Sequence, residues 1–208
     1  MNSYCDIDFA NRKKKRWIQT FFYSTSKVHQ ANVLILCGPD LNSHVADFKL
    51  ISGVHRDLSL TIYETDRKTY LKNVRDSKKY PTININIIND DIINAKVTRF
   101  VDLDFCCSLY TSFPIVEKIY NSMKNKCGTA KKTLNKHILI TFCVRDGNIG
   151  TKLKDSINDL CNLFGISNKF KPLDLLPKTN IMKHVSKDCM FSTYKDGTPM
   201  CTFSYQFK

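Results

Sequence analysis

The chain has 208 residues, of which 42% are hydrophobic and 25% are charged, and its formal net charge is +13 at neutral pH. This composition is typical of one globular domain with a substantial core, and no apolar run approaches the ~20 residues that a membrane-spanning helix needs. The N-terminus lacks the apolar stretch of a secretory signal, and the nine cysteines include no C-x-x-C pair that would favour a zinc site. We therefore expect an intracellular, cytoplasmic or nuclear protein with reduced thiols and no bound metal.

The positive charge is concentrated in three segments. Residues 1–30 carry +4, residues 117–136 carry +5 and residues 165–187 carry +4, so the rest of the chain is neutral. Clustered cations attract polyanions, and nucleic acid is the predicted partner; the alternative is that lysine-rich faces only keep the protein in solution. The candidate phosphate contacts are Arg12, Lys13, Lys14, Lys15 and Arg16, a run that also fits a nuclear-import signal or a solvated helix start.

An aromatic, amphipathic helix is predicted over residues 14–30, with the basic run at its start. The stretch NVLILCGPD follows at residues 32–40. Its apolar run predicts a buried strand, and a Gly-Pro turn then leads into a helix that extends to about residue 51. Strand, tight turn and helix in this order are typical of the beginning of an α/β cofactor-binding domain, so we expect a ligand near the turn.

Strands and helices continue to alternate along the chain. Glu64 ends the second predicted strand, Asp66 caps the next helix, and Pro114 is expected to open the helix after the fourth strand. The predicted strands cover residues 58–63, 82–88, 98–103 and 137–144, and the predicted helices cover residues 67–75, 115–126 and 149–164.

Two more strands, at residues 189–194 and 199–207, are predicted to form a hairpin around Asp196-Gly197, because an Asp-Gly pair favours tight hairpin turns. Five strands that alternate with helices imply a parallel sheet with right-handed crossovers. The predicted fold class is therefore α/β, with a closing antiparallel hairpin at one edge of the sheet.

This order of elements resembles class I, Rossmann-like S-adenosylmethionine-dependent methyltransferases over residues 15–208. Within that family the chain is most similar to small proteins of phages and viruses, which often carry a D-x-D-[FY] segment after the fourth strand; here it is Asp102-Leu103-Asp104-Phe105. The resemblance implies a single methyltransferase domain that binds S-adenosylmethionine across the carboxyl ends of strands 1 to 4 and acts on nucleic acid.

The resemblance also assigns cofactor-binding roles. The turn Cys37-Gly38-Pro39-Asp40 occupies the place of the family's glycine-rich loop, although only Gly38 of the E/D-x-G-x-G-x-G pattern is present. Glu64 takes the position of the acid that accepts hydrogen bonds from both ribose hydroxyls. Asp90 takes the position that receives the adenine amino group, with Asn89 or Asp91 as substitutes. The alternatives are a turn without a ligand, a solvated loop acid and ordinary turn chemistry.

The segment after the fourth strand is where the family places its substrate-facing residues. Asp102 and Asp104 share one face of the strand, and either carboxylate would orient or deprotonate the methyl acceptor. Phe105 stacks on a base or on adenine in this interpretation, or else belongs to the core. Arg145, after the fifth strand, holds a phosphate or pairs with Asp104, or else forms a structural salt bridge.

Two rival functions were weighed. The single-glycine loop also fits a catalytically degenerate Rossmann-like module that binds nucleic acid or a protein partner. An aminopropyltransferase shares the acids after strands 2 and 4, but its cationic polyamine substrates would be repelled by a chain of +13. Cofactor binding separates the methyltransferase from the degenerate module.

Overall fold

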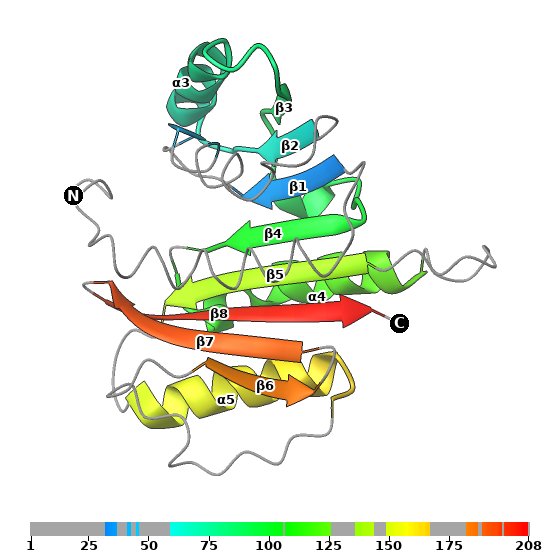
Figure 1. Ribbon diagram of the computed structural model, residues 1–208, viewed down its shortest axis with the longest axis vertical. Helices are drawn as coiled ribbons and strands as arrows, with labels where there is room; N and C mark the ends of the chain where they lie inside the picture. Colours follow the sequence, from blue (N-terminus) through cyan, green and yellow to red (C-terminus); the bar gives the residue numbers. More distant parts are fainter. Residues whose placement is uncertain are drawn as a thin grey trace.

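The computed structural model describes residues 32–36, 41, 42, 45, 59–105, 107–125, 136–143, 149–166, 182–186, 189–196 and 198–207. Eight strands form one sheet in the order β3-β2-β1-β4-β5-β8-β7-β6 (Figure 1). The strands are β1 (Asn32–Leu36), β2 (Ser59–Tyr63), β3 (Asn84–Ile88), β4 (Phe100–Asp104), β5 (Lys136–Cys143), β6 (Met182–Ser186), β7 (Cys189–Asp196) and β8 (Thr198–Phe207). The helices are α3 (Arg67–Ser77), the 3₁₀ helix η1 (Ile92–Asn94), α4 (Leu109–Asn125) and α5 (Ile149–Leu163).

The pairing of the strands confirms the predicted fold class. The five strands β1 to β5 pair in parallel. Parallel neighbours require crossover connections, and the described helices α3 and α4 lie between consecutive parallel strands in the chain. β8 then runs antiparallel between β5 and β7, and β6 adds an antiparallel edge. The result is a mostly parallel Rossmann-like sheet with an antiparallel C-terminal part.

Apolar residues cover both faces of the sheet, because alternate residues of each strand point to opposite sides. On one face, Val101 and Leu103 of β4 belong to the large cluster that includes residues of α4, α5 and β8. On the other face, Val33 and Ile35 of β1 pack with Phe100 in a second cluster. A strand buried on both faces reads as the continuous apolar run seen in the sequence, which is why β1 and β5 were identifiable.

Helix ends follow the local sequence signals in two cases. The Asp66 carboxylate accepts a hydrogen bond from Thr69 N at 2.7 Å and caps α3 as predicted. After α5, Gly165 has φ +66°, a left-handed conformation that glycine adopts without strain, and Ile166 N donates back to Cys161 O at 2.8 Å.

The structure differs most from the sequence prediction in three places. Pro114 does not open α4: the helix begins at Leu109, and the proline lies inside it. The backbone of Thr111 and Ser112 donates to Ser108 O, so the turn before the proline is already helical. The strands of the hairpin extend further than predicted, to an Asp196–Thr198 pair. Strand β6 was not predicted at all; its residues MKHVS contain no apolar run.

Candidate active site

The carboxyl ends of five parallel strands meet at one edge of the sheet, because neighbouring strands run in the same direction. Glu64 directly follows β2, Asn89 and Asp90 follow β3, and Asp104 is the last residue of β4. β1 separates β2 from β4 in the sheet, so Glu64 and Asp104 belong to strands two spacings apart, roughly 10 Å. The predicted cofactor acids and the predicted substrate acid therefore lie at the same edge.

Glu64 is held by backbone and side-chain hydrogen bonds. Its N–H donates to Ile88 O at 3.0 Å, which extends the pairing of β2 with β3 by one residue. Its Oε1 accepts a hydrogen bond from Asp66 N at 2.9 Å. This bond fixes the half-buried side chain, and the second carboxylate oxygen remains an available acceptor.

Asn89 joins the two loops at this edge. Its Nδ2 donates to Glu64 O at 2.8 Å and, more weakly, to Thr65 O at 3.4 Å. Its Oδ1 accepts a hydrogen bond from Arg67 Nη1 at 3.2 Å. The sequence analysis named Asn89 only as a substitute for Asp90, and its role in tying β2 to β3 was missed. A polar residue directly after a strand was the available signal, but it does not reveal a partner 25 residues away.

Asp90 and Asp91 organise the turn into η1. Asp90 Oδ1 accepts hydrogen bonds from Asp91 N at 2.7 Å and from Asn94 Nδ2 at 3.1 Å. Asp91 Oδ1 accepts from Ile93 N at 2.9 Å and caps the 3₁₀ turn. Asp90 and Asp91 therefore form an ordinary hydrogen-bonded turn, which was the alternative to a ligand role. The exposed Asp90 carboxylate also lies at the carboxyl edge of the sheet.

The two acids of β4 lie in different environments. Asp102 is 3% exposed and pairs in register with Ile35 of β1 and Leu139 of β5. Asp104, at the end of the strand, is half-buried and pairs with Thr141. Only Asp104 therefore combines partial exposure with a place at the carboxyl edge. The sequence analysis treated the two acids as equivalent, because alternation alone cannot distinguish the middle of a strand from its end.

Phe105 points to the opposite face from the two acids. Its ring is 4% exposed and belongs to the large core cluster, while its N–H donates to Thr141 O at 2.8 Å. A buried ring in the core is not accessible for stacking on a base or on adenine. The core alternative for Phe105 is the one that the structure supports.

Several predicted residues lie outside the described part of the chain. They are the cofactor turn Cys37-Gly38-Pro39-Asp40, Arg145 after β5, and the basic run Arg12 to Arg16. Their predicted roles stay predictions.

A buried histidine that the sequence analysis did not select lies near the opposite edge of the sheet. His137, near the start of β5, is 2% exposed and stacks on Phe100 with ring centroids 5.3 Å apart. Burial, and the nearby positive charge of Arg99, lower the pKa of His137 to about 4. The imidazole is therefore neutral at physiological pH, and its position at the amino end of the parallel strands separates it from the candidate site.

Two features are absent from the described residues. No group of three or more His, Cys, Asp or Glu side chains is placed to hold a metal ion within that part of the chain. Among the helices described, none has the length and apolar character to cross a membrane.

Comparison with known proteins gives matches in structure only. Neither a protein-family model nor a curated protein sequence matches the chain. An rRNA methylase from Streptococcus thermophilus superposes with a TM-score of 0.51 at 11% identity, over 92% of this chain and 95% of that one. The TYW2 protein of M. jannaschii, solved in complex with AdoMet, gives 0.51 at 10% identity, over 99% and 78%.

A ribosomal protein L11 methylase from Lactobacillus delbrueckii subsp. bulgaricus also matches, with a TM-score of 0.52 at 6% identity over 96% of this chain and 81% of that one. At such identities the similarity concerns the fold, and function has to be argued from the site. The chain has the Rossmann-like fold of class I S-adenosylmethionine-dependent methyltransferases.

Proposed function

We propose that this chain is an S-adenosylmethionine-dependent methyltransferase that acts on nucleic acid. The observation that carries the proposal is the Glu64 carboxylate, which is fixed at the carboxyl end of β2 by Asp66 N and by the backbone bond to Ile88. Ligands of open α/β sheets bind at this edge, and a structural neighbour is a complex with AdoMet.

The residues present fit the proposed cofactor. A ribose offers two hydroxyl donors, and a carboxylate has enough lone pairs to accept both while one oxygen also accepts from Asp66 N. Asp90, at the neighbouring strand end, is an acceptor for an exocyclic amine. The cofactor supplies an activated methyl group when it is bound.

Asp104 is the proposed catalytic residue. Its half-buried carboxylate at the end of β4 would accept a proton from the methyl acceptor or hold that acceptor in line by a hydrogen bond. Asp102, two residues earlier, is 3% exposed and has no proposed contact with substrate.

Nucleic acid is the proposed substrate class because of charge. The net charge of +13 is concentrated in three segments, as phosphate binding requires. One structural neighbour is an rRNA methylase by name, which agrees with this choice. The relationship to small phage and viral methyltransferases stays a prediction.

The test is calorimetric titration with S-adenosylmethionine and S-adenosylhomocysteine. We expect micromolar binding, and a Kd at least about tenfold higher for Glu64→Gln, which keeps the side-chain size but removes the charge-assisted hydrogen bonds. Lys68→Gln changes one charge on the adjacent helix α3 and serves as the matched control, with affinity within about twofold of the wild type.

Two results would contradict the proposal. Equal affinity in wild type and Glu64→Gln would exclude the ribose role of Glu64. Absence of binding at millimolar cofactor would exclude the methyltransferase and favour a Rossmann-like module that binds nucleic acid or protein. If the cofactor binds, transfer of a radiolabelled methyl group to RNA, DNA and protein fractions identifies the substrate.

A further inference from the structure

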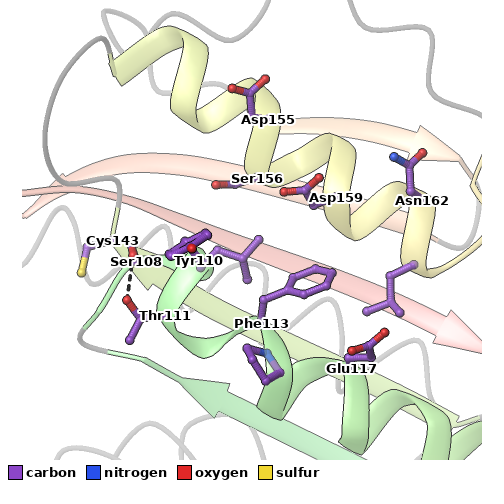
Figure 2. A pocket seen from close by; sticks show the side chains of 13 residues that line it. Ser108, Tyr110, Thr111, Phe113, Glu117, Cys143, Asp155, Ser156, Asp159 and Asn162 are labelled. Carbon is purple, nitrogen blue, oxygen red and sulfur yellow. Dashed lines mark hydrogen bonds between the residues drawn. The ribbon is translucent and has the colours of Figure 1, made fainter.

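A groove lies between α4 and α5 (Figure 2). Its volume is about 1090 Å³, and it is lined from both helices and from Cys143 at the end of β5. We call it the α4–α5 groove. Figure 2 shows Phe113 near the centre of the space between the helices and Asp159 on the side of α5 that faces α4, whereas Asp155 lies on the upper side of α5 in this view.

Both helices contribute apolar residues to the groove. Phe113, Pro114 and Leu163 line it, and the ring of Tyr110 stands at its edge with 92% of the residue exposed. Pro114 has no N–H, so the carbonyl of Tyr110 cannot receive the usual helical hydrogen bond from four residues ahead. A bound segment would cover the exposed Tyr110 ring and would donate a hydrogen bond to the Tyr110 carbonyl.

The charge of the groove is opposite to that of the chain. Three carboxylates line it, from Glu117 on α4 and from Asp155 and Asp159 on α5, and none of its described lining residues is basic. Asp155 and Asp159 are four residues apart on one helix, a spacing at which like charges destabilise a helix. Partial burial and the neighbouring Asp155 raise the pKa of Asp159. The groove therefore keeps a repulsive pair of acids within a protein of net charge +13.

We propose that the α4–α5 groove binds a Lys/Arg-rich segment of a partner protein that also carries an apolar side chain. The three carboxylates match cationic heads, the aliphatic stems of lysine and arginine suit apolar walls, and a guanidinium can lie on the Tyr110 ring. Phosphates of a nucleic acid would be repelled by the same carboxylates. A free polyamine would neutralise the acids but would leave the Tyr110 and Phe113 rings without an apolar partner.

This interaction surface reaches the carboxyl edge of the sheet at Cys143, the last residue of β5, but it uses no residue at the ends of β2, β3 or β4. Peptide binding therefore requires neither the proposed cofactor nor the proposed catalytic residue Asp104. Failure of cofactor binding would leave the groove proposal standing, and failure of peptide binding would leave the methyltransferase proposal standing.

The probe is a fluorescein-labelled 12-residue peptide in which lysine and arginine alternate with leucine, measured by fluorescence anisotropy on the full chain. We expect saturable binding, and a Kd at least about tenfold higher for the double variant Asp155→Asn/Asp159→Asn, because two opposing charges are lost. Tyr110→Ala should raise the Kd about fivefold, as expected for an exposed aromatic contact. A peptide with glutamate in place of every basic residue should not bind.

The matched control is Thr82→Lys/Asn84→Lys, two exposed positions before and within β3 at the far edge of the sheet. It changes the net charge by the same +2 as the double amide variant and should leave the Kd within about twofold. An equal loss in both double variants would overturn the proposal, because the peptide would then sense only net charge.

Three further results would also overturn it. One is a wild-type chain that does not bind the peptide at all. A second is a concentration-dependent dimer in sedimentation velocity that disappears in Asp155→Asn/Asp159→Asn, which would make a second copy of this chain the occupant. Binding of spermine that is unaffected by Tyr110→Ala, with peptide binding no tighter, would assign the groove to polyamines instead.

Discussion

The two halves of the sheet are stabilised by different interactions. In the half formed by β3, β2, β1 and β4, the polar residues that follow β2 and β3 are held by hydrogen bonds, as at Glu64 and Asn89. The other half, β5, β8, β7 and β6, packs aromatic rings against α5. Phe164 stacks on Phe203 and on Tyr205, with ring centroids 5.5 and 4.5 Å apart.

Because of this difference, we expect the aromatic half to determine the stability of the protein and the polar half to determine ligand binding. Burial of aromatic area contributes several kcal/mol per ring, whereas exposed loop hydrogen bonds contribute about 1 kcal/mol each. A substitution in the aromatic half should therefore strongly lower the free energy of unfolding, and one at the polar edge should alter binding with little effect on stability.

The largest effect is expected for Phe203→Ala. The ring is fully buried in the large cluster, so its removal should lower the free energy of unfolding by about 3–5 kcal/mol. Urea denaturation measures the change. In the polar half, Leu71→Ala on α3 removes a residue that is 52% exposed and should lower it by less than about 1 kcal/mol. Similar decreases in the free energy of unfolding for both variants would contradict the difference between the two halves.

The stability of the protein should depend on pH through His137, which stacks on Phe100 where the two halves of the sheet meet. The pKa of His137 is lowered to about 4 in the folded chain from an ordinary value of 6.5, so the folded state binds fewer protons than the unfolded state between these values. Stability should be complete above pH 6.5 and fall, by at most about 3 kcal/mol, as the pH drops to 4. His137→Phe keeps the stacked ring and should flatten this part of the stability profile. An unchanged slope would assign the acid sensitivity to other groups.

The smallest effect concerns the acids of α5. Asp159→Asn removes the like-charge contact with Asp155 and should raise the free energy of unfolding by about 0.3 kcal/mol at neutral pH. Because the pKa of Asp159 is raised, the gain should disappear at a pH low enough to protonate the wild-type carboxyl. Asp76→Asn provides the contrast: that carboxylate is paired with Lys72 at 3.2 Å and Lys79 at 2.8 Å, so the same change should destabilise. A lower free energy of unfolding for Asp159→Asn would contradict a repulsive contact between Asp155 and Asp159.

The sequence predicted the parts of the fold that depend on local pattern. Apolar runs located β1 and β5, Asp66 located the start of α3, and the Asp-Gly pair located the β7–β8 hairpin. Strand β6 was missed because its pairing with β7 depends on a partner strand and leaves no apolar run in MKHVS. The start of α4 was misjudged because proline is a strong signal, whereas Ser108, whose carbonyl accepts the first hydrogen bonds, is a weak one.

The candidate site was predictable to the level of strand ends. Glu64 and Asp104 follow from strand order, since the last residue of a parallel strand has only one edge to occupy. The difference in burial between Asp102 and Asp104, the core position of Phe105 and the link through Asn89 depend on neighbours in three dimensions. The α4–α5 groove was missed for the same reason, because its lining residues come from two helices that are distant in the sequence, up to Glu117 on α4 and from Asp155 on α5.

The place of β8 between β5 and β7 has a consequence for synthesis on the ribosome. β5 has its parallel neighbour β4 early, but its other edge stays open until residues 198–207 emerge, some sixty residues later. An unpaired apolar strand such as Lys136–Cys143 is a template for association with other chains. A nascent chain halted before β8 should therefore be prone to aggregate and depend on chaperones, and release of the complete hairpin should end that dependence.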